Sequence, residues 1–309
     1  MTCSIVVRAY NEEKHIGRLL EGIRQQTLKD VEIILVDSGS TDQTVAIAES
    51  FGARIVRIPS AEFTFGRSLN FGLRVATREF VVIASAHVYP VYPDWLETLL
   101  RPFEDEKVAL TYGKQRGPGS AKYSEQQIFQ QWYPNASQPH QTTAFCNNAN
   151  VAIRKSLWEK NPYDETLTGL EDLAWAKWAH EQDYAITYVA EAEIIHVHNE
   201  TPHGVFYRYR REAMAFKRIY PEAHFNMYDF LRLTATNIFS DLWHAVRERV
   251  LWKNIASIFW FRFMQFHGTR IGHREISLIT PQLRETFYYA RERKVKPESG
   301  REVEPIQYN

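Results

Sequence analysis

Polar side chains that can hydrogen-bond a ligand stand directly after three apolar runs in the first 90 residues. Residues 10–12 read Tyr-Asn-Glu, residues 37–39 read Asp-Ser-Gly and residues 85–87 read Ser-Ala-His. Each apolar run is typical of a buried strand, and open α/β sheets bind their ligands beyond the carboxyl ends of the strands. The three polar segments therefore predict one ligand site at that edge of a sheet.

Two histidines with strand spacing offer metal chemistry. His196 and His198 lie at the end of a predicted strand. Because side chains at i and i+2 of a strand point to the same face, both imidazoles can face one site, and imidazole suits transition metals. Two interpretations stay open: the pair binds a metal ion, or His196 packs and His198 binds a phosphate directly.

Alternating strands and helices position these groups. Apolar runs and helical spacing predict strands over residues 4–8, 31–36, 53–58 and 80–84, with helices over residues 16–23 (capped near Asn11), about 43–51 and 68–76. This order implies an α/β fold with a largely parallel sheet and helices on both faces. Residues 113–145 read as mobile or irregular; a helix over residues 171–181 and strands over residues 185–189 and 193–197 follow.

Composition excludes several classes of protein. With 309 residues, 44% apolar, 24% charged and zero formal net charge, the chain is neither disordered nor collagen-like. Cys3 and Cys146 are too few for a disulfide framework or a cysteine-rich zinc module, which favours a reducing compartment. No secretory leader is visible, and the apolar stretch over residues 251–266 is too short and polar to span a bilayer.

Positive charge gathers late in the chain. Residues 201–294 carry 16 Lys and Arg against 8 Asp and Glu, together with Trp243, Trp252 and Trp260. This pattern fits either peripheral contact with an anionic membrane or a helical subdomain whose aromatic residues form its core. We expect a catalytic domain over residues 1–202, a helical, basic and aromatic region over residues 203–294, and a disordered tail over residues 295–309.

Several ordered motifs resemble the family 2 glycosyltransferases, which are inverting nucleotide-sugar enzymes. Residues 7–13 read Val-Arg-Ala-Tyr-Asn-Glu-Glu, and residues 33–42 read Ile-Ile-Leu-Val-Asp-Ser-Gly-Ser-Thr-Asp. The resemblance continues through residues 65–70, 86–90, 148–150 and 169–172, and covers roughly residues 3–200. It implies the GT-A fold, a Rossmann-like and mostly parallel central sheet flanked by helices, here with a C-terminal helical extension.

The resemblance also implies a nucleotide-sugar site at the strand ends. The family holds the base with the Asp that matches Asp37, and a carboxylate there can accept the ring N–H of uracil or thymine. Asn11 and Glu12 would hold base or ribose, and Arg67 lies where the family often has a basic residue near base or phosphate. The remaining predicted contacts are Ala9, Ser85 and Ala86. The alternatives are a helix cap for Asp37, a cap and first-turn acid for Asn11 and Glu12, and a solvated Arg67.

The metal motif departs from the family's usual Asp-x-Asp, because residues 85–87 are Ser-Ala-His. Loss of both carboxylates disfavours Mg²⁺, which prefers hard oxygen ligands. The related polypeptide N-acetylgalactosaminyltransferases have Asp-x-His there, with the histidine binding Mn²⁺, and residues 87–100 look similar to theirs. The resemblance thus implies a divalent cation, Mn²⁺ rather than Mg²⁺, held by His87, His196 and His198. A metal-independent enzyme is the alternative.

An adjacent acid pair is the catalytic candidate. Glu171 and Asp172 resemble the family's Glu-Asp pair, whose Asp is usually the base that takes the acceptor hydroxyl proton. Adjacent side chains of a helix cannot both face one substrate, so Asp172 is assigned as the base and Glu171 as an acceptor contact or outer partner. The alternative is an acid pair favoured by the helix dipole. Trp175 and Trp178 either stack on acceptor sugar or pack in the core.

The sequence therefore predicts an inverting glycosyltransferase that moves a sugar from a nucleoside-diphosphate sugar to a hydroxyl of a glycan or lipid-linked acceptor, in bacterial surface polysaccharide synthesis. It is expected in the cytoplasm, at the cytoplasmic face of the inner membrane, without a nucleic-acid partner. One rival is a non-catalytic nucleotide- or sugar-binding protein, suggested by the missing Asp-x-Asp. The other is a nucleotidyltransferase, which should show a Gly-rich phosphate loop that is absent near the N-terminus.

Overall fold

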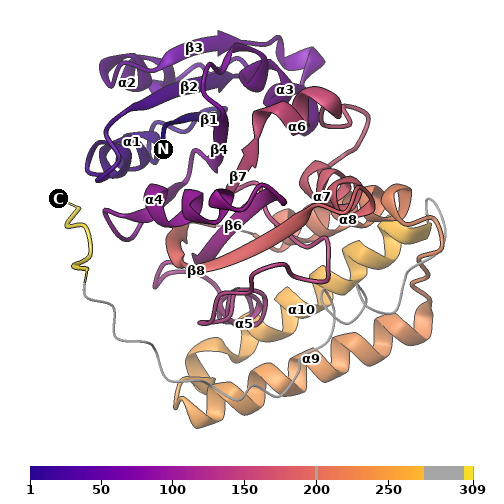
Figure 1. Ribbon diagram of the computed structural model, residues 1–309. Coiled ribbons are helices and arrows are strands. Elements are labelled where there is room, and N and C mark those ends of the chain that lie inside the picture. Colours follow the sequence, from indigo (N-terminus) through magenta and orange to yellow (C-terminus); the bar gives the residue numbers. More distant parts are fainter. Residues whose placement is uncertain (199–200, 275–302, 309) are drawn as a thin grey trace.

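An eight-stranded mixed sheet in the order β3-β2-β1-β4-β7-β6-β8-β5 forms the centre of the protein (Figure 1). The structure is a computed structural model that describes residues 1–198, 201–274 and 303–308. The strands are β1 (Cys3–Ala9), β2 (Val31–Asp37), β3 (Arg54–Arg57), β4 (Phe80–Ser85), β5 (Val88–Pro90), β6 (Val108–Arg116), β7 (Asn150–Arg154) and β8 (Ala185–His196). The first four strands pair in parallel, β7 is antiparallel to β4 and β6, and β5 is antiparallel to β8. The predicted α/β class is confirmed.

Helices cover both faces of this sheet. They are α1 (Ile16–Arg24), α2 (Thr44–Ser50), α3 (Phe65–Val75), α4 (Trp95–Leu100), α5 (Tyr123–Trp132), α6 (Lys155–Lys160), α7 (Glu171–Glu181), α8 (Pro202–Ile219), α9 (Met227–Arg247) and α10 (Leu251–Arg274). Strand alternation divides the core into two layers: Ile5 and Val7 lie in the layer of Leu19 on α1, whereas Val6 lies in the layer of Leu69 on α3. Since both faces are buried, the polar side chains gather at the strand ends.

The expectation of an irregular segment over residues 113–145 is correct only for residues 117–122 and 133–145, which lie outside the helices and strands. Residues 113–116 belong to β6, and α5 follows within the segment. The helix forms because Tyr123, Ile128 and Phe129 are buried against neighbouring elements, which local Gly, Pro and Gln content does not reveal. The two strands expected over residues 185–197 are one strand, β8.

Both ends of the chain also differ from expectation. The first helix is capped at His15 rather than near Asn11, because the Glu12 carbonyl accepts the N–H groups of His15 and Ile16 in an intervening turn. Most of the tail expected to be disordered lies outside the described residues. Residues 303–308, however, lie against β5, where the Tyr308 hydroxyl donates to the Pro90 carbonyl.

The last three helices form a layer beside α5 and α7, with α10 packed along α8 and α9 (Figure 1). A Cβ at Gly268 would meet the Phe206 carbonyl oxygen at 2.3 Å, so α10 approaches the α8 backbone closely. Arg262 of α10 donates to both carboxylate oxygens of Asp241 on α9 at 2.8 Å, a buried bidentate pair. Within the described ranges, none of the helices has the length and apolar character needed to cross a bilayer.

Candidate active site

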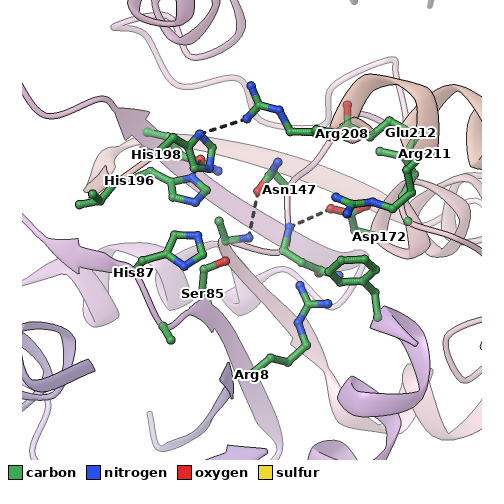
Figure 2. Close-up of a pocket in the computed structure, with 18 of the residues that line it drawn as sticks. Arg8, Ser85, His87, Asn147, Asp172, His196, His198, Arg208, Arg211 and Glu212 are labelled. Carbon is green, nitrogen blue, oxygen red and sulfur yellow. Dashed lines mark hydrogen bonds between the residues drawn. The ribbon is translucent and has the colours of Figure 1, made fainter. Parts of the chain in front are cut away.

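A cavity of about 600 Å³ opens where β1 and β4 end, and it is bounded by α5, α7, α8 and the end of β8 (Figure 2). Nine of the predicted site residues line it: Ala9, Glu12, Ser85, Ala86, His87, Glu171, Asp172, His196 and His198. The other three, Asn11, Asp37 and Arg67, are absent from its lining.

Three histidines meet on one side of the cavity. His87 directly precedes β5, and the antiparallel β5–β8 pairing sets Val88 opposite His196, with His198 two residues beyond. One ring nitrogen from each of the three histidines lies within 4.8 Å of those of the other two. The strand spacing of His196 and His198 and the strand-end position of His87 thus bring all three rings together.

Carboxylates lie beside two of these rings. The Nδ1 atom of His87 lies 2.8 Å from a Glu12 carboxylate oxygen, and Nδ1 of His198 lies 2.7 Å from that of Glu125 on α5. A carboxylate next to the ring nitrogen is the arrangement found behind metal-bound histidines. Nη1 of Arg208, which can only donate, lies 3.1 Å from the same Nδ1 of His198 (Figure 2), so this nitrogen has both a carboxylate and a guanidinium as neighbours.

The third ring follows the same pattern and is the most buried. Nδ1 of His196 lies 2.8 Å from the side-chain oxygen of Gln115 on β6, while its buried Nε2 has no hydrogen-bond partner within the described structure. A buried nitrogen without a partner is costly unless it meets a ligand. Burial, with His198 next, lowers the pKa of His196 well below its usual range, and burial with Arg208 does the same for His198. Neutral rings are the form that ligates metal ions.

The predicted acid pair stands at the start of α7, where Leu170 adopts a left-handed φ of 56°. Asp172 accepts the backbone N–H of Asn148 at 2.8 Å (Figure 2), and Glu171 accepts the Asn148 side-chain amide at 3.0 Å. Burial, followed by the charge of Glu171, raises the pKa of Asp172 to about 7, against the lowering effect of the backbone N–H groups of Asn148 and Leu173 and of Arg8. A fixed carboxylate with this pKa has the properties of a general base.

Asp37 and Asn11 lie beside the cavity but brace a loop. The buried Asp37 carboxylate accepts the backbone N–H groups of Gly39 and Ser40 at 3.1 Å, and the Asn11 side-chain oxygen accepts that of Thr41 at 2.8 Å. These contacts stabilise the loop and are not the helix caps named as the alternative, because the N-cap positions of α1 and α2 are His15 and Gln43. Nucleotide contact by Asp37 stays a prediction.

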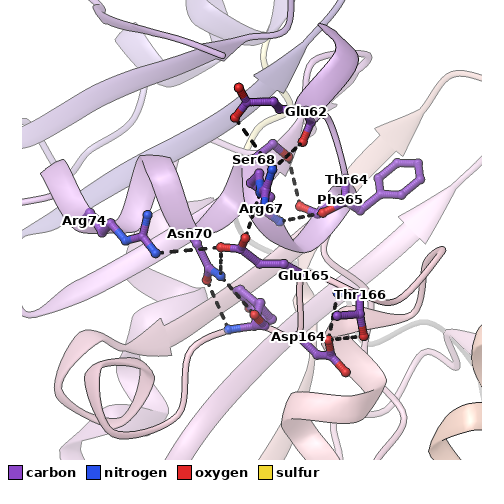
Figure 3. A network of polar contacts seen from close by, with 11 residues as sticks. Glu62, Thr64, Phe65, Arg67, Ser68, Asn70, Arg74, Asp164, Glu165 and Thr166 are labelled. Atoms are coloured by element: carbon purple, nitrogen blue, oxygen red, sulfur yellow. Dashed lines mark hydrogen bonds and ion pairs between the residues drawn. The ribbon is translucent and has the colours of Figure 1, made fainter. Parts of the chain in front are cut away.

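Arg67 belongs to a separate polar network between α3 and residues 164–166 (Figure 3). Its Nε donates to the Glu165 carboxylate at 2.8 Å, and the other oxygen of that carboxylate accepts the Asn70 amide at 2.9 Å. The pairing with Glu165 raises the pKa of Arg67, and Arg67 is not among the residues that line the cavity. Contact of Arg67 with base or phosphate stays a prediction.

Comparison with known proteins decides the family. Residues 4–160, just over half of the chain, match the sequence profile described as glycosyl transferase family 2. The chain belongs to glycosyl transferase family 2. The matched residues include β1 to β4 and the end of β7, and so contain the strand-end motifs.

Curated family relatives cover about two thirds of the chain. The O-antigen chain rhamnosyltransferase RfbN of Salmonella typhimurium is 26% identical over 222 residues, 68% of this chain and 70% of the relative. The O-antigen chain rhamnosyltransferase WbaN of Salmonella anatum is 28% identical over 219 residues, 67% of this chain and 69% of the relative. The chain is accordingly a glycosyltransferase, as the sequence predicted.

Solved structures share the fold. Mannosyltransferase PcManGT from Pyrobaculum calidifontis, in complex with GDP-Man and Mn²⁺, superimposes with a TM-score of 0.58 at 17% identity, over 88% of this chain and 86% of that one. At this level of sequence identity, the similarity is evidence for the fold alone. It confirms the predicted GT-A architecture of the family 2 domain.

Sequence reasoning missed several cavity residues of this family 2 enzyme. Gln115 and Glu125 lie in the segment read as irregular, and Arg8, Arg208 and Arg211 were not singled out. A helical signal was present on α8, where buried Val205, Tyr209, Ala213 and Phe216 recur at intervals of three or four residues. Which helix edge faces the cavity depends on docking of α8 against the sheet, and spacing alone does not determine that.

Proposed function

We propose that this enzyme is an inverting glycosyltransferase acting on a nucleoside-diphosphate sugar, with Asp172 as its general base. The supporting observation is one cavity that contains both a buried carboxylate of raised pKa and a cluster of three histidines. In a direct displacement, Asp172 would take the proton of the acceptor hydroxyl as oxygen attacks the anomeric carbon, and the diphosphate would leave from the opposite face. Glu171 would contact the acceptor or support the base.

We propose that His87, His196 and His198 hold a divalent cation, an Ala-His variant of the family's metal motif. Three imidazole nitrogens suit Mn²⁺ better than Mg²⁺, which prefers oxygen ligands. Glu12, Gln115 and Glu125 behind the rings fit that use, since outer hydrogen bonds orient ligating histidines. A bound cation would stabilise negative charge on the departing diphosphate.

The acceptor proposal rests on the curated relatives. Both named Salmonella proteins are O-antigen chain rhamnosyltransferases, so we propose a role in bacterial surface polysaccharide synthesis, with nucleotide-activated rhamnose as the first donor to test. Thermal shift with UDP-, GDP-, dTDP- and CMP-sugars identifies the donor. NMR of the product then reports the anomeric configuration; retention of the donor configuration would refute the inverting mechanism.

Asp37→Ala should weaken binding of a pyrimidine nucleotide by about ten- to a hundred-fold, because one charge-assisted hydrogen bond is worth about 1.5–3 kcal/mol. Calorimetry with the nucleoside diphosphate measures the change. Asp42→Ala is the matched control, since Asp42 also braces the loop through the N–H groups of Glu13 and Thr44. Equal affinities in both folded variants would leave Asp37 only with its role in stabilising the loop.

The C-terminal helices carry an exposed aromatic face, for which we propose an anionic membrane as partner. Its members are Tyr228, Leu231, Phe239, Trp243, Val246, Trp252, Phe259 and Phe263, of which Trp252 is 86% exposed. Exposed Arg247, Arg249 and Lys253 lie at the α9–α10 turn. We propose that residues 1–202 form the catalytic unit, to which α8 adds cavity residues such as Arg208 and Arg211. Residues 203–294 would also attach this unit to the cytoplasmic face of the inner membrane.

Flotation with vesicles should therefore recover the protein with anionic lipid, less at high salt and little with neutral lipid. Trp243→Ser with Trp252→Ser should reduce recovery, because both indoles are lost from the exposed aromatic face. Equal recovery in the soluble fraction with and without anionic lipid would contradict membrane attachment.

A further inference from the structure

Two arginines share one aromatic ring at the cavity. The guanidinium carbon of Arg8, near the end of β1, lies 4.8 Å from the Phe65 ring centroid, and that of Arg211 on α8 lies 4.7 Å from it. Three segments far apart in the sequence thus bring two positive charges to one place. Both arginines line the same cavity as Asp172 (Figure 2).

Neither guanidinium has a close hydrogen-bonded carboxylate. The nearest acid to Arg8 is Glu171, whose Oε1 lies 3.5 Å from Nη1 of Arg8, and this buried Nη1 makes no hydrogen bond in the part of the chain that is described. Arg211 forms no ion pair with any described residue. Two cations with free donors in a partly enclosed cavity favour an anion.

Stacking on Phe65 also prepares both groups for an anion. A guanidinium that packs its plane on a ring keeps its N–H donors at its edge, where they can form the parallel pair of hydrogen bonds that phosphate oxygens accept. The ring restricts both side chains before any ligand arrives. This lowers the conformational entropy lost on binding.

We propose that Arg8 and Arg211 form an anion subsite that binds a phosphate-type group of a substrate. In Figure 2 the two arginines lie beside Asp172, across the cavity from the three labelled histidines. The group is either the diphosphate of the donor or a phosphate of a lipid-linked acceptor. Assignment to a substrate rests on the proposed transferase function, whereas binding of phosphate does not.

Binding of inorganic pyrophosphate in EDTA, followed by ³¹P NMR, tests the subsite without metal and without turnover. Arg8→Gln and Arg211→Gln should each weaken binding by about tenfold or more, because each removes charge-assisted hydrogen bonds. Arg74→Gln is the matched control, since Arg74 stacks on Phe71 5.4 Å away but lies outside the cavity lining. Absence of pyrophosphate binding by the wild type, or equal binding by all variants, overturns the proposal.

Two further variants separate a binding role from a folding role. Arg8→Lys keeps the charge but loses the planar fork, so its affinity should lie between those of the wild type and Arg8→Gln. Phe65→Leu removes the shared ring without changing charge, and it should weaken pyrophosphate binding in a protein with a normal melting curve. Pyrophosphate affinities of both variants equal to wild type would count against the subsite.

The source of the anion follows from a second pair of measurements. If the donor diphosphate binds here, Arg8→Gln and Arg211→Gln weaken the nucleoside diphosphate and leave the free nucleoside unchanged. If the acceptor phosphate binds here, the KM for the acceptor rises and the affinity for the nucleoside diphosphate stays constant. Either result supports the subsite, and the pyrophosphate titration stands even if sugar transfer is never observed.

Discussion

Asp172→Asn is expected to lower kcat by about 10²–10⁴-fold, the usual contribution of a positioned general base. The amide keeps the size of the carboxylate, and its oxygen can still accept the Asn148 N–H, but its NH2 group cannot accept the Leu173 N–H as the second carboxylate oxygen does. A melting curve of the variant therefore accompanies the kinetics. Affinity for the donor should barely change, since the proposed base acts on the acceptor hydroxyl. Single-turnover kinetics and donor calorimetry on the same variant measure both quantities.

The pH profile gives this assignment a second readout. Burial and Glu171 raise the pKa of Asp172 to about 7. A general base acts only when it is deprotonated. The value of kcat/KM should therefore be at its maximum above this pKa and fall as the pH drops through it. Asp172→Asn should remove that acid limb from whatever activity remains.

Glu171→Gln is the comparison that divides the roles within the pair. It removes a negative charge next to Asp172, so the pKa of Asp172 should fall and the acid limb should move to lower pH. Turnover should drop less than in Asp172→Asn. Near-normal turnover in Asp172→Asn together with inactive Glu171→Gln would make Glu171 the base instead.

The sheet and the strand-end motifs could be predicted because their signals are local. Apolar runs such as residues 80–84 stay strands when buried on both faces, and the ends of β1 to β4 lie within one residue of the predicted spans. The meeting of His196 and His198 follows from strand alternation alone. His87 could be grouped with these two histidines only through the resemblance to the family, because residue spacing does not show that it lies near them.

The residues behind the histidines depended on tertiary packing. Gln115 and Glu125 reach the rings only because β6 extends past residue 113 and α5 folds against the end of β8. Glu125 is also held by Arg208, whose Nη2 donates to it at 3.2 Å from α8. The local content of Gly, Pro and Gln does not reveal hydrogen bonds between residues that are 73 and 83 positions apart in the sequence.

The direction in which a side chain points could not be predicted from the sequence either. Arg67 lies two residues after Phe65, which lines the cavity, yet its side chain pairs with the Glu165 carboxylate and is not part of that lining. Trp175 is 1% exposed and donates to the Asn161 carbonyl at 2.8 Å, so it packs in the core rather than on an acceptor sugar. In each case the side chain follows a partner that only the folded chain supplies.

Loss of a hydrogen-bond partner behind a metal ligand usually weakens metal binding by about 10- to 100-fold. His87→Ala and His198→Ala are each expected to weaken Mn²⁺ binding by more than this. Each variant removes one of three proposed ligand nitrogens, and the remaining two form an incomplete site. Titration followed by the EPR signal of free Mn²⁺ measures affinity without turnover. His140→Ala is the matched control, because His140 pairs with Asp105 and is not part of the cavity lining.

Gln115→Leu should lie between these variants and the wild type, since it keeps all three ligands but releases the Nδ1 atom of His196. Its loss should be about 10- to 100-fold, the range typical of an outer partner. Activity should follow the same order, and Mn²⁺ should support it better than Mg²⁺ because the ligands are nitrogens. Full activity in EDTA would contradict the metal site: protein side chains alone would then stabilise the leaving diphosphate, with His87 as a hydrogen-bond donor.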